Sequence, residues 1–218
     1  DNFAMLLPSG TPEHLQKNMM SLEDDFRDRG IHIRLQLSIG RYIIKDKQLS
    51  FSDIMNKALL ARRTVKGRYN VSLAYYNGKM QKQIQEEQHI ISRMDFALSS
   101  HQFEVWLQPK YNHETGAMIG AEALVRWNSS EHHVMIPPNV FIPVFERNGF
   151  IYELDKYVWN EVCKMLRKWL DEGTCTLPIS INVSRMDILQ SDVYEVLTGL
   201  VEKHEISAHL LQLEITES

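Results

Sequence analysis

Hydrophobic and polar positions alternate with strand or helix spacing along most of the chain. Residues 1–76 combine short alternating segments with longer helix-like segments, so we predict a small α/β unit there. The expected elements are strands at residues 3–7, 32–44 and 71–76, a helix at residues 12–29 that ends before Gly30, and a helix that runs from a Ser52 cap to about residue 66.

Residues 79–99 form a predicted polar helix with a narrow apolar stripe. Such a helix is typical of a connector that lies on a neighbouring surface, and a short dimerising coiled coil is the alternative. The predicted stripe consists of Met80, Ile84, Ile91, Met94 and Leu98.

After residue 100 the pattern predicts strands that alternate with helices. This order favours a parallel sheet or a (β/α) barrel. The predicted strands are residues 103–111, 119–127, 178–184 and 210–216, and the predicted helices are residues 138–148, 152–172 and 186–205.

Composition narrows the classes of protein without naming one. Of the 218 residues, 44% are hydrophobic and 24% are charged, as in an ordinary globular protein. The net charge of −4 gives no general attraction to a nucleic acid polymer or an anionic membrane, and we find no membrane segment. Two cysteines, Cys163 and Cys175, make no disulfide framework, so we expect a cytoplasmic location.

Candidate chemistry begins in the strand around residue 122. Alternate residues of a strand share a face, so Glu122, Leu124 and Arg126 point the same way. The Cα atoms of Glu122 and Arg126 lie roughly 13 Å apart, too far for a direct ion pair. A half-buried Glu needs a partner or it takes up a proton, and a metal ion is one such partner.

The same alternation recurs on two later strands. Asn182 and Glu214 each lie on the polar side of their strand, so three strands offer one oxygen ligand apiece. Carboxylate and amide oxygens suit Mg²⁺ or Mn²⁺. A hydrogen-bonded polar layer inside a barrel explains the pattern equally well at this point.

A family resemblance then becomes specific, because five segments occur in order. The chain from about residue 95 to residue 218 resembles the N-terminal half of an EAL domain, the cyclic-di-GMP phosphodiesterase family. The resemblance implies a partial (β/α)8 TIM-like barrel whose first strand runs antiparallel to the others. The segments are Gln108-Pro109-Lys110, Glu122-Ala123-Leu124-Val125-Arg126-Trp127, Pro138 with Phe141-Ile142-Pro143, Asn182-Val183-Ser184, and Leu213-Glu214-Ile215-Thr216-Glu217-Ser218.

The resemblance also implies roles for matching residues. Metal ligands fall on Glu122, Asn182 and Glu214; substrate contacts fall on Gln108, Leu124 and Arg126, with Arg126 on a phosphate; and Glu217 supports a loop near the metals. The implied reaction is a two-metal hydrolysis, with Mg²⁺ or Mn²⁺, of cyclic-di-GMP to linear pGpG. An inactive EAL-type receptor that only binds cyclic-di-GMP is the alternative. The resemblance also allows a homodimer formed through the EAL domain.

The later elements of the family, a paired Asp-Asp motif, a Lys and a further Glu, do not occur in the chain. We therefore expect the chain on its own to be inactive, and the choice between enzyme and receptor stays open.

Residues 1–78 resemble the C-terminal part of a GGDEF domain, and residues 79–94 would be a connecting helix. The resemblance rests on residues 1–8, on Ser38-Ile39-Gly40 and on the helix from Asn56 to Arg63. Asn2 stands where the GGDEF signature has Glu, and Asn56 stands where Asp is usual. We therefore expect a degenerate regulatory domain that makes no cyclic-di-GMP.

Overall fold

The computed structural model describes residues 3–7, 26–30, 38–66, 73–129, 134–174 and 177–215. The chain divides into two compact units, residues 1–85 and residues 86–218. The division falls inside helix α3 (Gly78–Ser99), so its first turns belong to the first unit and the rest to the second. Each unit is described by itself.

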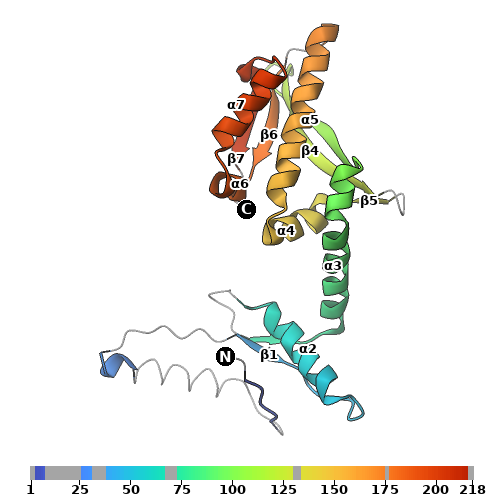
Figure 1. The fold of residues 1–218 in the computed structure, drawn as a ribbon, viewed down its shortest axis with the longest axis vertical. Coiled ribbons are helices and arrows are strands. Elements are labelled where there is room, and N and C mark those ends of the chain that lie inside the picture. The colour runs from blue at the N-terminus through green and yellow to red at the C-terminus, as the bar shows by residue number, and fades with distance from the viewer. Residues whose placement is uncertain are drawn as a thin grey trace. The chain divides into compact units, whose positions relative to one another are not determined.

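The first unit contains two short parallel strands joined through a helix (Figure 1). Strand β1 (Ile39–Arg41) pairs with β2 (Leu73–Tyr75), and α2 (Phe51–Arg63) packs on both. Gly40 allows this packing, because a Cβ atom there would lie 1.9 Å from the carbonyl oxygen of Ala58. Only glycine fits where β1 and α2 approach so closely.

Several predicted boundaries in this unit are wrong. The N-cap of α2 is Ser50 rather than Ser52, because Ser50 has extended backbone angles and its Oγ accepts a hydrogen bond of 3.1 Å from the backbone N–H of Asp53. The strand predicted at residues 32–44 ends at Arg41. Residues 3–7 form no strand, and their side chains are exposed, so burial does not reward an extended conformation there.

The helix predicted at residues 12–29 is visible only at its end. Residues 26–28 are helical, and Gly30 follows with a φ of 74°. This left-handed conformation is the helix stop that the sequence predicted. The rest of that segment lies outside the described residues.

The apolar face that helix α3 buries is shifted by one residue along the chain from the predicted stripe. Ile90 and Ala97 are buried, whereas Ile91 is 40% exposed. Ile90, Met94 and Ala97 recur at helical spacing, and Ile91 falls outside that row. Arg93 is also buried, and its Nη2 donates a hydrogen bond of 3.2 Å to Ser129 Oγ. The pattern of apolar residues in the sequence could not predict that an arginine is buried on this face.

The second unit is built on a sheet with the strand order β3-β4-β6-β7. Its first strand runs antiparallel to β4, and β4, β6 and β7 run parallel to one another. The antiparallel first strand agrees with the EAL resemblance. A short strand that was not predicted, β5, pairs with the end of β4. The bounds are β3 (Phe103–Tyr111), β4 (Met118–Ser129), β5 (Val134–Ile136), β6 (Ile179–Val183) and β7 (Leu211–Ile215).

Helices α4 (Pro138–Asn148), α5 (Ile151–Glu172), α6 (Arg185–Gln190) and α7 (Val193–Lys203) and the 3-10 turn η1 (Ala208–Leu210) complete this unit. The single helix predicted at residues 186–205 is in fact two helices. The break occurs because Asp192 starts α7, with its side chain accepting a hydrogen bond of 3.1 Å from the backbone N–H of Glu195.

One face of the sheet packs against α4 and α5 (Figure 1). Trp127 is fully buried there among aromatic rings, and its Nε1 donates a hydrogen bond of 3.2 Å to Gln102 Oε1. Ala121 and Ala123 point to the same side and are also buried. The neighbours of Trp127 are Phe103, Phe141 and Phe145, all with ring centroids within 6.0 Å of it. The opposite face is therefore left for the polar residues of the strands.

Candidate functional site

The polar residues of four strands meet on the face of the sheet that points away from this core. The register pairs Gln108 with Glu122, Glu122 with Ser180, and Asn182 with Glu214. Directly paired residues of neighbouring strands project to the same side. The structure thus brings the predicted ligands of β4, β6 and β7 onto one surface.

Glu122 and Asn182 are in direct contact. The Nδ2 atom of Asn182 donates a hydrogen bond of 3.2 Å to Glu122 Oε1. Trp159 Nε1 donates a hydrogen bond of 3.0 Å to the carbonyl oxygen of Asn182, which ties this point of β6 to α5. The partner that Glu122 needed is therefore an amide on the adjacent strand.

Glu214 pairs with Lys110, which follows Gln108 and Pro109 on β3. Lys110 Nζ forms an ion pair with Glu214 and donates a hydrogen bond of 2.8 Å to Ser180 Oγ. The hydrogen bond from Lys110 holds the pKa of Glu214 below its ordinary value, although burial acts in the opposite direction. The alternation of Gln108 and Lys110 in β3 is the signal that could have found this residue.

Arg126 lies further along β4 on the same face. Its Nη1 donates a hydrogen bond of 2.9 Å to the carbonyl oxygen of Val125, and its guanidinium lies 5.9 Å from the ring centroid of Trp106. Within the described ranges Arg126 forms no ion pair. Its guanidinium is thus held in position, and no carboxylate in the described part of the chain neutralises it.

The remaining predicted residues fall at different places. Leu124 is half-buried between Glu122 and Arg126, and Gln108 is exposed beside Glu122. Glu217 lies outside the described residues, as does Asn2 of the first unit.

The donor set fits a hard divalent cation in its chemistry. Two carboxylates and one amide oxygen are ligands of the kind that Mg²⁺ and Mn²⁺ prefer. Among the described residues no group of three or more His, Cys, Asp or Glu side chains gathers as a metal cluster. The predicted ligands contribute two such carboxylates, Glu122 and Glu214, with the amide of Asn182 as the third member, so their role as metal ligands stays a prediction.

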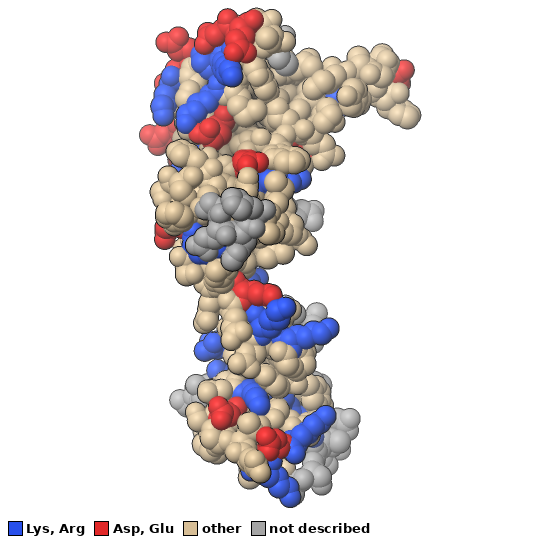
Figure 2. Space-filling view, turned by 90° about the vertical axis from the view of Figure 1, so that its right-hand side faces the viewer, with Lys and Arg blue, Asp and Glu red and all other residues tan. Residues whose placement is uncertain are grey.

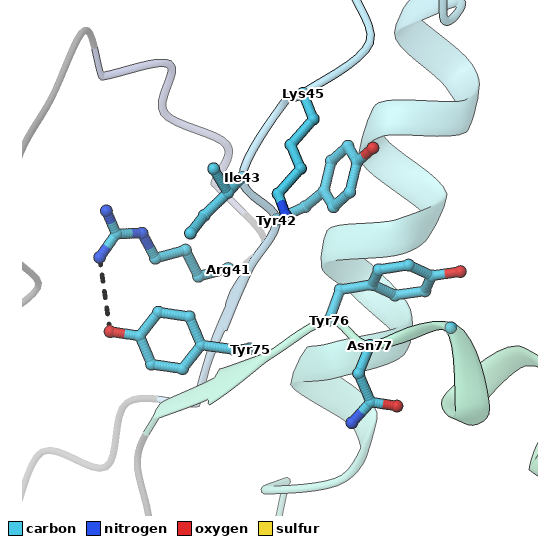
Figure 3. Close-up of a pocket in the computed structure, with 8 residues that line it drawn as sticks. Arg41, Tyr42, Ile43, Lys45, Tyr75, Tyr76 and Asn77 are labelled. Carbon is cyan, nitrogen blue, oxygen red and sulfur yellow. Dashed lines mark hydrogen bonds between the residues drawn. The ribbon is translucent and has the colours of Figure 1, made fainter.

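The first unit carries a separate pocket of about 350 Å³ at the carboxyl ends of β1 and β2 (Figure 3). Arg41 Nη1 donates a hydrogen bond of 3.4 Å to the hydroxyl of Tyr75, and Lys45 and Tyr76 also line the pocket. Lys57 Nζ lies 5.0 Å from the ring centroid of Tyr42 and 5.9 Å from that of Tyr76. No predicted site residue lies in this pocket.

On the face shown in Figure 2, charges of both signs interleave in the upper part of the picture, whereas Lys and Arg predominate in the lower part. On α5, Lys164 pairs with Glu161 at 2.6 Å and Lys168 with Glu172 at 3.8 Å. Such surface pairs leave little net potential along this helix. In the described part of the chain, no helix combines the length and the apolar character that a membrane crossing requires.

Comparison with known families shows which family the chain resembles. The model of the EAL domain family matches residues 91–218, more than half of the chain. Among curated proteins, MucR of Pseudomonas aeruginosa, named a bifunctional diguanylate cyclase/cyclic di-GMP phosphodiesterase, is 26% identical over the whole chain, which spans 32% of its length. The oxygen sensor protein DosP of Escherichia coli is 30% identical over 66% of the chain, which spans 18% of its length. The chain thus spans less than a third of these relatives.

Solved structures of related proteins have the same fold. A structure of the MucR phosphodiesterase from P. aeruginosa in complex with c-di-GMP has a TM-score of 0.55 and 32% identity, over 60% of this chain and 52% of that chain. The EAL enzyme Bd1971, with cAMP and cyclic-di-GMP bound, has a TM-score of 0.55 and 26% identity, over 78% of this chain and 45% of that chain.

Proposed function

Since the chain belongs to the EAL domain family, we propose that its protein hydrolyses one phosphodiester bond of cyclic-di-GMP and releases linear pGpG. The observation that carries the proposal is that Glu122, Asn182 and Glu214 lie on one sheet face, with the guanidinium of Arg126 on the same face and without an ion pair among the described residues. The names of MucR and of its c-di-GMP complex support the choice of substrate.

In this proposal each residue has one task. Glu122, Asn182 and Glu214 hold Mg²⁺ or Mn²⁺, and the bound metal supplies an activated water and neutralises charge on the phosphate. Arg126 binds a phosphate oxygen pair with its planar fork. Gln108 and Leu124 contact the substrate, and Glu217 supports the loop beyond β7.

The same proposal extends to the architecture. The strands β3, β4, β6 and β7 would be the opening part of a (β/α)8 barrel, and residues 1–78 would be the C-terminal part of a degenerate GGDEF domain. The parallel pair β1 and β2 with α2 packed on it supports an α/β unit of that general kind. Its Asn2 would leave it without synthesis of cyclic-di-GMP.

A receptor without turnover is the second candidate, and one contact favours it. The Lys110 ammonium already pairs with Glu214, so a cation of the protein itself competes for a carboxylate that a metal would need. A protein in which this pair persists would bind the dinucleotide through Arg126 and leave it uncut.

Product analysis separates the two candidates. The full-length protein is incubated with cyclic-di-GMP and Mg²⁺ or Mn²⁺, and linear pGpG is measured by chromatography while binding is measured by calorimetry. We expect metal-dependent pGpG, its loss in Glu122→Gln, and wild-type turnover in Glu172→Gln, a control on the exposed surface of α5. Tight binding without pGpG under any metal would establish the receptor, and neither binding nor turnover would refute both candidates.

A further inference from the structure

Trp106 occupies the middle of β3, and the proposed chemistry gives it no task. Its neighbours Val105 and Leu107 turn to the other side of the strand and pack against the core. Trp106 itself is 50% exposed on the polar face. In the register of β3 and β4 it lies opposite Leu124, beside the pair of Gln108 and Glu122. A large aromatic ring is thus presented next to the proposed substrate residues.

The edge of this ring is held in place by a short chain of hydrogen bonds. Trp106 Nε1 donates a hydrogen bond of 3.0 Å to Glu104 Oε2, and Asn128 Nδ2 donates one of 2.8 Å to Glu104 Oε1. The bond from Asn128 and then that from Trp106 hold the pKa of Glu104 below its ordinary value. Both oxygens of one carboxylate therefore serve to orient the indole.

Arg126 completes the arrangement, because it lies directly opposite Glu104 and its guanidinium is 5.9 Å from the centroid of the Trp106 ring. Tryptophan is the aromatic side chain with the strongest attraction for a cation at its face. The same arginine is the residue that we assign to a substrate phosphate. A ligand that places a phosphate on Arg126 therefore places its neighbouring groups close to the indole.

We propose that Trp106 stacks on a guanine base of the dinucleotide whose phosphate Arg126 binds. The inference rests on the proposed function, and it assigns the base-recognition part of that site. Bases stack on aromatic side chains in sites that track a phosphate backbone, since every base has a π-face. Glu104 is then a positioning residue, which fixes the indole without contact to the base.

The test compares aromatic, aliphatic and small residues at this position in the full-length protein. Affinity for cyclic-di-GMP is measured by equilibrium dialysis without added divalent metal, so that substrate is not consumed. We expect Trp106→Ala and Trp106→Leu to weaken binding by roughly 5- to 150-fold, which is the effect of one lost base stack. Trp106→Phe keeps an aromatic face, so it should stay within about fivefold of the wild type.

Indole fluorescence adds a readout that a purely structural role would not move. The chain has four tryptophans, and only stacking on Trp106 predicts quenching on ligand addition that disappears in Trp106→Phe while that variant still binds. Trp106→Leu with wild-type affinity would overturn the inference and leave the proposed function standing, because leucine preserves packing but not stacking. A wild-type protein that does not bind cyclic-di-GMP would refute both.

Discussion

The two faces of the β3-β4-β6-β7 sheet come from alternate residues of the same strands, yet they are filled in opposite ways. On one face Trp127 is fully buried in an aromatic cluster under α4 and α5. On the other face Trp106 is 50% exposed and donates a hydrogen bond to Glu104, and Lys110 pairs with Glu214. Adjacent residues of one strand therefore lie on faces with different roles. A substitution on the apolar face should mainly lower stability, and one on the polar face should mainly change turnover or ligand binding.

The largest expected effect is on stability at the apolar face. Trp127→Ala removes a fully buried ring and leaves a cavity, so it should lower the free energy of unfolding by about 3–5 kcal/mol. Trp106→Ala, the matched change on the polar face, should cost roughly 1 kcal/mol or less because its side chain is half exposed. Urea denaturation of both variants measures the contrast, and equal losses would abolish the distinction between the faces.

The division into two faces was readable from the sequence wherever strand alternation was regular. Glu122 and Arg126 were predicted to share a face, and the same period of two turns Trp127 to the other side. Cross-strand pairing was not readable, since the register that sets Lys110 beside Ser180 and Glu214 depends on residues some 70 to 104 positions apart. The residues that share a face of one strand were therefore predictable, whereas the contacts between strands were not.

Element ends were predicted less well for similar reasons. Ser50 and Ser52 are both possible helix caps, and only the backbone conformation selects Ser50. The break between α6 and α7 depends on Asp192, a polar residue within an otherwise helical pattern. The short strand β5 exists because the end of β4 offers it a partner, which no local pattern of three residues reveals.

On the polar face, the next largest effect should be on turnover. Glu122→Gln keeps the size of the side chain and its contact with Asn182 but removes the negative charge that a metal ligand needs. We expect the rate of pGpG formation to fall by at least about a hundredfold, with little change in melting temperature. If turnover falls only in proportion to a lost fraction of folded protein, Glu122 belongs to a structural polar layer.

A smaller effect is expected at the other end of the same strand face. Arg126→Ala should raise the apparent KM by roughly ten- to a hundredfold, since it removes a charge-assisted contact with phosphate of about 1.5–3 kcal/mol. Arg126→Lys keeps the charge and loses the planar fork, so it should recover only part of the affinity. Calorimetry should detect normal metal binding in both variants, and a loss of metal binding would place Arg126 in the ligand network instead.

The apolar side of the sheet has a polar exception, the pair of Asp155 on α5 and Asp187 on α6. Asp187 is fully buried, and its Oδ2 accepts hydrogen bonds of 2.6 and 2.7 Å from the backbone N–H and the hydroxyl of Ser184. Burial and the neighbouring Asp187 carboxylate raise the pKa of Asp155 to about 9. Asp155 is therefore protonated in the folded protein at neutral pH, and its interaction with Asp187 favours this state.

This pair makes stability depend on pH, and the sign of that dependence follows from proton linkage. The unfolded chain releases the Asp155 proton near its ordinary pKa, whereas the folded chain keeps it to a pH of about 9. Between these values the folded state binds more protons, so the contribution of Asp155 to stability is present at low pH and declines as the pH rises.

Asp155→Asn keeps a donor toward Asp187 without titrating, and it should gain about 1–3 kcal/mol over the wild type at pH of about 8 relative to pH of about 5. Asp171→Asn, a change at an exposed position of the same helix, should show no such drift, and urea unfolding at both pH values compares the three proteins. An advantage of Asp155→Asn that stays constant between the two pH values would mean that the pair does not share a proton, and that Asp155 is merely a poor residue for its surroundings.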